Sequence, residues 1–134
     1  MARSGMAIFS ALWRAYGEGR LDRSLHLVDA DCELVLPDGH TTLRGHDGVR
    51  QLLRSGRREW RTVTITYDEI SETCPDCVVG IGHVAAASAD GAAKLERALA
   101  CVAEFRDGRL VRGRVFEDRA AALTYARGLD RADD

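Results

Sequence analysis

The hydrophobic pattern changes from a helical period to a period of two at Arg61, and this change most constrains the fold. The residues that follow alternate β-branched or aromatic side chains with threonines, as half-buried strands do: Val63, Ile65 and Tyr67 alternate with Thr62, Thr64 and Thr66. Three further strands fit residues 78–87, 95–105 and 110–117. The last two are joined at Asp107-Gly108, a pair that accepts positive φ in a tight hairpin. The pattern therefore predicts four long consecutive strands.

Helical patterns lie on both sides of these strands. Apolar side chains recur at i, i+3, i+4 and i+7 near the start, which predicts one buried helix face: Phe9, Leu12, Trp13 and Tyr16. A short helix fits 22–28, a short strand fits 32–36, and a third helix opens at His46 or Asp47. Asp118 is the predicted N-cap of a final helix that ends at Gly128.

The order of these elements indicates the fold class. Helices grouped before a run of antiparallel strands are typical of α+β proteins. We expect a cone-shaped, curved antiparallel sheet wrapped around the N-terminal helices, with an internal pocket. A length of 134 residues fits one domain over 1–134, with a core from about residue 6 to 129.

Composition and charge exclude several classes of protein. Hydrophobic residues make up 46% and charged residues 30%, which excludes a disordered chain. A net charge of −2 lacks the global basic field of a nucleic-acid binder. No apolar run approaches the roughly 18 residues that span a membrane. We expect a cytoplasmic protein whose four cysteines are free thiols.

Four segments resemble the SnoaL-like group of the nuclear-transport-factor-2-like superfamily. They are the opening segment 12–22, the segment 44–50 (Arg-Gly-His-Asp-Gly-Val-Arg) and the two closing segments 105–111 and 117–123. The superfamily also contains ketosteroid isomerases, limonene-epoxide hydrolases and polyketide cyclases. The resemblance covers about residues 6–129 and implies the cone-shaped fold. Its motifs are mostly turns and caps, so it does not fix the reaction.

The catalytic positions of these enzymes carry other residues in this chain. Ketosteroid isomerases carry a Tyr on the first helix, an Asp just before a Pro that follows a strand, and an acid in the penultimate strand. The matching positions here are Leu12, Leu36 and Cys101, none of which supplies the acid, base or oxyanion donor. The catalytic aspartate that limonene-epoxide hydrolases carry on the last strand matches Val115, and their earlier Arg-x-Asp falls near Ile81 and His83. Polyketide cyclases need a pocket acid, for which Glu117 is the nearest candidate.

Strand parity places three ionisable groups on apolar faces without reference to any family. His83 shares a face with Val79 and Ile81, Arg97 extends the face of Leu99 and Cys101, and Glu117 continues that of Val115. A buried histidine and carboxylate can perform general acid–base chemistry, so we predict His83 as a base and Glu117 as its partner or acid. The alternative is a hydrogen-bonded core histidine with solvated charges at the strand ends.

Aromatic and apolar side chains are the candidates for lining a ligand pocket. Trp13, Tyr16 and Trp60 can stack on a flat ligand, although an aromatic stripe also fits a plain core. The other predicted lining residues are Arg97, Cys101, Phe105 and Val115.

The sequence favours neither a metal nor a cofactor. Cys74-x-x-Cys77 has no second ligand pair at zinc spacing, so we interpret it as a turn. His40 and His46 flank a loop without an acidic partner at recognisable spacing. No phosphate loop, dinucleotide fingerprint or nucleophile elbow is present.

These observations lead to one reading and one alternative. We expect the chain to bind a small, largely apolar molecule in its internal pocket. If it is an enzyme, we expect a cofactor-free isomerase, cyclase or hydrolase. The alternative is a non-catalytic ligand-binding or dimeric accessory protein. We also expect a homodimer formed through the outer sheet face that carries Arg112 and Arg114, with no nucleic-acid or membrane partner.

Overall fold

The computed structural model describes residues 5–18, 20–59, 61–74 and 76–132. Its framework is a six-stranded sheet in the order β2-β1-β6-β5-β4-β3. The four predicted long strands are present as β3 (Thr62–Cys74), β4 (Cys77–Ala87), β5 (Lys94–Arg106) and β6 (Arg109–Phe116). At the β5–β6 hairpin, Asp107 and Gly108 have φ angles of 53° and 76°, as predicted for a tight turn.

The N-terminal strands differ from the predicted antiparallel arrangement. β1 (Val28–Val35) pairs with β6 in parallel and with the short β2 (Thr42–Arg44) in antiparallel fashion, so the sheet is mixed. β1 also begins four residues before the predicted start at Cys32. Acidic residues occupy alternate positions in the first half of β1. Because acidic residues are depleted in strands, the sequence pattern did not predict this half as strand.

Three α-helices and one 3₁₀-helix accompany the sheet. α1 is Gly5–Gly17, η1 is Leu21–Leu27, α2 is Gly45–Glu59 and α3 is Arg119–Ala132. The segment predicted as a helix over 22–28 is the 3₁₀ element, because Ser24 interrupts it with φ −108°. Asp118 caps α3 by accepting a hydrogen bond from the Ala120 N–H at 2.9 Å, as predicted. α3 continues through Gly128, so the predicted stop there is wrong.

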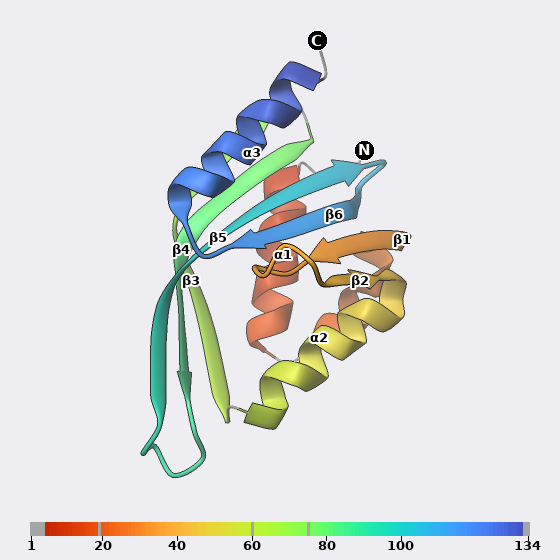
Figure 1. The fold of residues 1–134 in the computed structure, drawn as a ribbon. Helices are drawn as coiled ribbons and strands as arrows, with labels where there is room; N and C mark the ends of the chain where they lie inside the picture. Colours follow the sequence, from red (N-terminus) through yellow and green to blue (C-terminus); the bar gives the residue numbers. More distant parts are fainter. Residues whose placement is uncertain (1–4, 19, 60, 75, 133–134) are drawn as a thin grey trace.

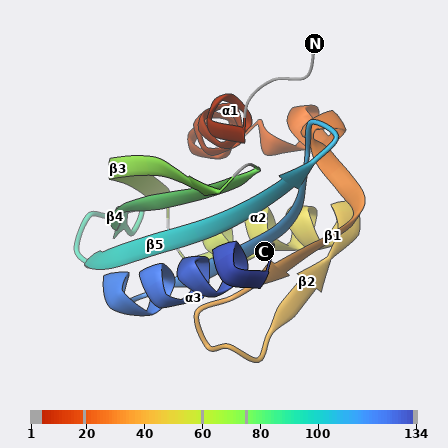
Figure 2. The same cartoon turned by 90° about the horizontal axis from the view of Figure 1, so that it is seen from above.

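The helices cover opposite faces of the sheet. The sheet curves with α1 and α2 on its concave side (Figure 1), which we call the inner face. α3 lies on the opposite, outer face (Figure 2). β-Bulges add to the bending of the strands: β3 has two extra residues relative to β4, and β6 has one relative to β5. The α+β class is thus confirmed, with an open sheet whose edges are β2 and β3.

Each face has its own hydrophobic cluster. The inner cluster joins α1 to β4, β5 and β6 through residues such as Phe9, Val78 and Phe105. The outer cluster joins α3 to the same sheet through residues such as Val79, Val102 and Ala122. None of the helices in the described part of the chain is both long and apolar enough to cross a membrane.

Candidate functional site

An apolar cavity of about 80 Å³ lies on the inner face of the sheet. Its walls come from α1, α2, β1, β5, β6 and the residues beside β1. The lining side chains are Phe9, Leu12, Trp13, Tyr16, Val28, Leu34, Leu36, Val49, Leu52, Cys101, Ala103, Phe105, Leu110 and Val115, with Gly113. Five of the predicted lining residues are therefore in the wall: Trp13, Tyr16, Cys101, Phe105 and Val115.

The aromatic stripe of α1 forms one wall. Phe9 is fully buried and packs edge-on against Trp13, with ring centroids 6.2 Å apart. Trp13 contacts Tyr16 in the same manner at 5.5 Å. Trp13 and Tyr16 are only partly buried, whereas Phe9 belongs both to the buried core and to the cavity wall. The predicted contribution of Trp60 lies outside the described residues.

The opposite wall is formed by paired residues of β5 and β6. Cys101 faces Val115 and Ala103 faces Gly113 across the two strands. Ala103 and Gly113 have little or no side chain, and this lack of bulk leaves the space that α1 does not fill. The strand parity of these residues was predictable from their alternation, but the space between them and α1 was not.

The cavity carries no group that ionises near neutral pH. Among the described lining residues there is no Asp, Glu, His, Lys or Arg. Burial raises the pKa of the Cys101 thiol to about 12, so this side chain is neutral at physiological pH. The site is therefore suited to holding an apolar molecule and poorly suited to acid–base chemistry.

His83 lies on the other side of the sheet. Its predicted alignment with Val79 and Ile81 is correct, but those two residues face α3 and not the cavity. Its Nδ1 lies 3.6 Å from Asp68 Oδ2, and its side chain is 39% exposed. Alternation predicts which residues of a strand share a face but not which face meets the cavity, so the expected pocket position of His83 is wrong.

Glu117 and Arg97 are exposed and do not line the cavity. Glu117 follows the last residue of β6, and Arg97 lies far along β5 opposite Val84. The structure thus does not assemble His83, Arg97 and Glu117 into one site. The catalytic roles assigned to His83 and Glu117 remain predictions.

Tyr67 is a residue of the site region that the sequence interpretation missed. Its ring lies 5.1 Å from that of Phe9 and 5.4 Å from that of Trp13. Its hydroxyl is buried without a hydrogen-bond partner among the described residues. Its only sequence signal was its place in the alternation of Val63 and Ile65, which marks a face of the strand but no function.

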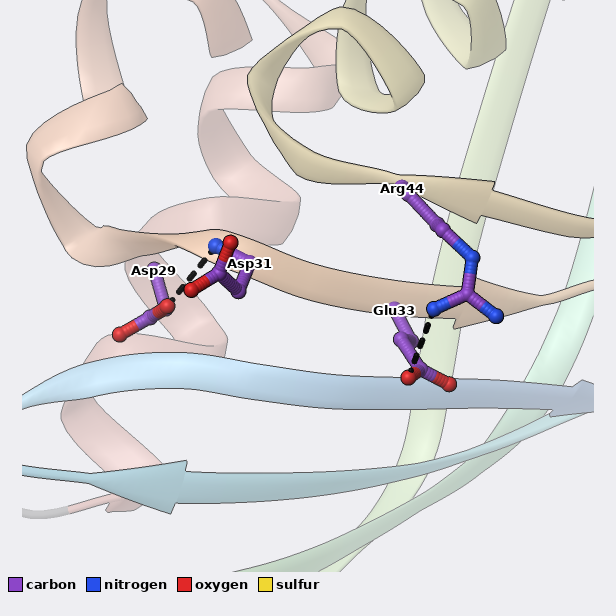
Figure 3. Close-up of polar contacts among 4 residues, drawn as sticks. All are labelled: Asp29, Asp31, Glu33 and Arg44. Carbon is purple, nitrogen blue, oxygen red and sulfur yellow. Dashed lines mark hydrogen bonds and ion pairs between the residues drawn. The ribbon is translucent and has the colours of Figure 1, made fainter.

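An acidic row occupies the outer side of β1, away from the cavity. Figure 3 shows Asp29, Asp31 and Glu33 along the strand, with Glu33 Oε1 accepting a hydrogen bond from Arg44 Nη1 at 2.9 Å. The Asp31 N–H donates to Asp29 Oδ1 at 2.8 Å. Nowhere in the described chain do three His, Cys, Asp or Glu side chains converge as a metal site would require.

The cysteine pair of the β3–β4 connection forms part of a hairpin. Cys74 and Cys77 face each other across the two strands. Cys77 is a buried free thiol that accepts a hydrogen bond from Thr73 Oγ1 at 3.3 Å. The interpretation of this motif as a turn agrees with that geometry.

Comparisons with known proteins place the fold among characterised families. Residues 9–113 match the sequence model described as the SnoaL-like domain. No curated protein matches the chain significantly. An NTF2-like protein of unknown function from Burkholderia pseudomallei is 21% identical, with a TM-score of 0.75 over 90% of this chain and 95% of that one.

Two further solved structures have the same fold. IdmH from Streptomyces antibioticus, a proposed polyketide cyclase, is 18% identical with a TM-score of 0.74, covering 94% of this chain and 99% of that one. A hypothetical protein of ketosteroid isomerase-like fold from Catenulispora acidiphila, in complex with trimethylamine, is 13% identical with a TM-score of 0.68 and 94% coverage of each chain. At these identities the similarity shows the fold alone.

Proposed function

Because the chain belongs to the SnoaL-like domain family, we propose that it binds a small, largely apolar molecule in the cavity between α1 and the sheet. The observation that carries this proposal is the cavity itself, whose walls are aliphatic and aromatic. Buried apolar cavities stay dry and accept apolar guests, since water finds no hydrogen-bond partners in them.

The volume limits the size of the ligand. A cavity of about 150 Å³ accommodates benzene. The 80 Å³ cavity described above is about half as large, so without movement of its walls it suits a guest of about three heavy atoms. A larger ligand needs a wall to move, and Trp13 and Tyr16 are the partly buried aromatic side chains of that wall.

Filling the cavity tests the proposal. Ala103→Leu adds three carbon atoms at a fully buried lining position, and we expect it to abolish binding of cyclopentane derivatives. Ala98→Leu makes the same change at an exposed position of the same strand and serves as the control. Binding is followed by ¹H–¹⁵N chemical-shift titration, which detects millimolar affinities. Equal binding by wild type and Ala103→Leu would place the ligand site elsewhere.

A second candidate function is a cofactor-independent isomerase, cyclase or hydrolase with His83 as base and Glu117 as its partner or acid. The favouring observation is the fold shared with IdmH, a proposed polyketide cyclase. The outer-face position of His83 weighs against this mechanism. If His83→Ala and Glu117→Ala both leave turnover and ligand affinity intact, the assignment is wrong.

We further propose that the protein is a cytoplasmic homodimer. The free thiols of Cys32, Cys77 and Cys101 suit a reducing compartment. For the dimer, the relevant surface is the outer face of β1 and β6, where Glu33 lies beside Arg112. Arg114 is less suited to this role than predicted, because its guanidinium packs over the rings of Phe116 and Tyr125 at 5.1 and 4.9 Å.

A further inference from the structure

The Tyr67 hydroxyl is an unusual group in this structure. It is buried, and no atom of the described residues forms a hydrogen bond with it. Buried phenol groups nearly always have a partner, because a buried donor that loses water without replacement destabilises the folded state. An orphaned hydroxyl beside a cavity therefore needs an explanation.

Three neighbours locate this hydroxyl next to the cavity wall. The Tyr67 ring packs against Phe9 and Trp13, both of which line the cavity. Burial, together with the neighbouring Cys101 thiol, raises the pKa of Tyr67, and Cys101 also lines the cavity. The phenol ring thus packs against lining residues of α1, and its hydroxyl remains a protonated hydrogen-bond donor at physiological pH.

The wall also contains the Trp13 indole N–H and the Tyr16 hydroxyl, but neither of them is a buried donor without a partner among the described residues. The Cys101 thiol is neutral and only a weak donor. Tyr125 also has a buried hydroxyl without a partner among the described residues, but it belongs to α3 and packs in the outer cluster. Tyr67 is the tyrosine of this pair that a guest of the cavity can approach.

We propose that Tyr67 is the polar anchor of the ligand site and donates a hydrogen bond to a carbonyl oxygen on an otherwise apolar ligand. This inference rests on the proposed function and narrows it to small ketones, aldehydes or esters. To reach the hydroxyl, the ligand displaces Trp13, which is only partly buried, lines the cavity and packs against the Tyr67 ring. The same movement enlarges the cavity.

Two probes of the same shape separate the hydrogen bond from apolar contact. Cyclopentanone and methylenecyclopentane differ in that only the ketone carries an oxygen acceptor. In Tyr67→Phe we expect the affinity for cyclopentanone to fall about three- to tenfold, the range of one neutral hydrogen bond, with the affinity for methylenecyclopentane unchanged. Tyr125→Phe removes the same atom from the outer cluster and should alter neither affinity. Each variant is compared with wild type, so the different hydrophobicity of the two probes cancels.

The infrared carbonyl stretch of bound cyclopentanone gives an independent measurement. A hydrogen bond from Tyr67 lowers its frequency in the wild type, and the shift disappears in Tyr67→Phe. Retention of both the shift and the affinity in Tyr67→Phe would overturn the inference while leaving the proposed function in place. If neither probe binds the wild type, the proposed function and the anchor both fail.

Discussion

Tyr67 and Tyr125 carry the same chemical group on opposite sides of one sheet. Both hydroxyls are buried without a partner in the described part of the chain. Tyr125 lies beneath Arg114, whereas Tyr67 adjoins the cavity wall. A buried hydroxyl without a partner beside the cavity is a feature that stability alone does not explain.

The free protein should not depend on the Tyr67 hydroxyl for stability. We expect Tyr67→Phe to raise the free energy of unfolding by about 1 kcal/mol, because the variant no longer buries an unpaired donor. Urea denaturation of the ligand-free protein measures this difference.

Tyr67→Leu is the companion variant, since it removes the ring that contacts Phe9 and Trp13. We expect a loss on the order of 1–2 kcal/mol from those aromatic contacts. A large loss in Tyr67→Phe as well would mean that the hydroxyl is hydrogen-bonded within the protein.

At the scale of elements, β4 is shaped by two glycines on its inner side. A Cβ on Gly80 would lie 2.6 Å from Phe9 Cζ and 2.7 Å from Tyr67 Cδ1. A Cβ on Gly82 would overlap the carbonyl oxygen of Thr66 in β3. The absence of side chains at these positions lets both rings pack close to the strand, beside the bulge between Tyr67 and Glu69.

Gly82→Ala should therefore destabilise the protein by about 2–3 kcal/mol, the usual range for overpacking, because the obstructing atom belongs to the backbone and cannot turn away. Gly128→Ala is the matched control. Gly128 lies within α3 with open space around it, so the alanine should stabilise the helix by about 0.5–1 kcal/mol. Thermal unfolding measures the change in stability of both variants, which we expect to have opposite signs. A Gly82→Ala variant as stable as wild type would contradict the close approach of β3 and β4 at this position.

The elements also show which features could be predicted from the sequence. The alternation after Arg61 and the Asp107-Gly108 turn are local signals, and both were confirmed. β2 has three residues and no pattern of its own, so only its pairing with β1 defines it. Gly128 resembled a helix stop because the continuation of α3 depends on its packing against the sheet.

Part of the candidate site was also predictable, because strand alternation is a local signal. Alternation identified Cys101, Phe105 and Val115 as sharing an apolar face, and the structure places all three in the cavity wall. For His83, alternation could not distinguish the face toward α1 from the face toward α3, since both are apolar. The orphaned hydroxyl of Tyr67 depends on the relative position of α1, β3 and β5, which no local pattern encodes.

At the scale of the whole molecule, the resemblance to SnoaL-like proteins is confirmed by the match over residues 9–113. Assembly is the open question at this scale. α3 packs against β3, β4, β5 and β6, and the outer side of β1 carries Asp29, Asp31 and Glu33. Arg112 lies next to this row, and its Nε is buried without a partner among the described residues. Under twofold symmetry, the acidic row of one subunit can face Arg112 of the other.

We expect light scattering to give a mass of about twice 14.7 kDa. Arg112→Glu should shift the population toward monomer, and higher salt should act in the same direction because the contact is ionic. Arg127→Glu makes the same charge change on an exposed position of α3 and should leave the mass unchanged. A wild-type mass near that of one chain would reject the dimer.

The parallel pairing of β1 with β6 has a consequence for synthesis. Residues 28–35 obtain their main neighbour only when residues 109–116 are available, so most of the chain must leave the ribosome first. Until then, the aromatic stripe of α1 lacks the β5 and β6 side chains that face it across the cavity. During translation α1 can pack against η1, β3 and β4, but part of its apolar stripe stays uncovered until β5 and β6 are made, so we expect the nascent protein to bind chaperones that recognise such surfaces.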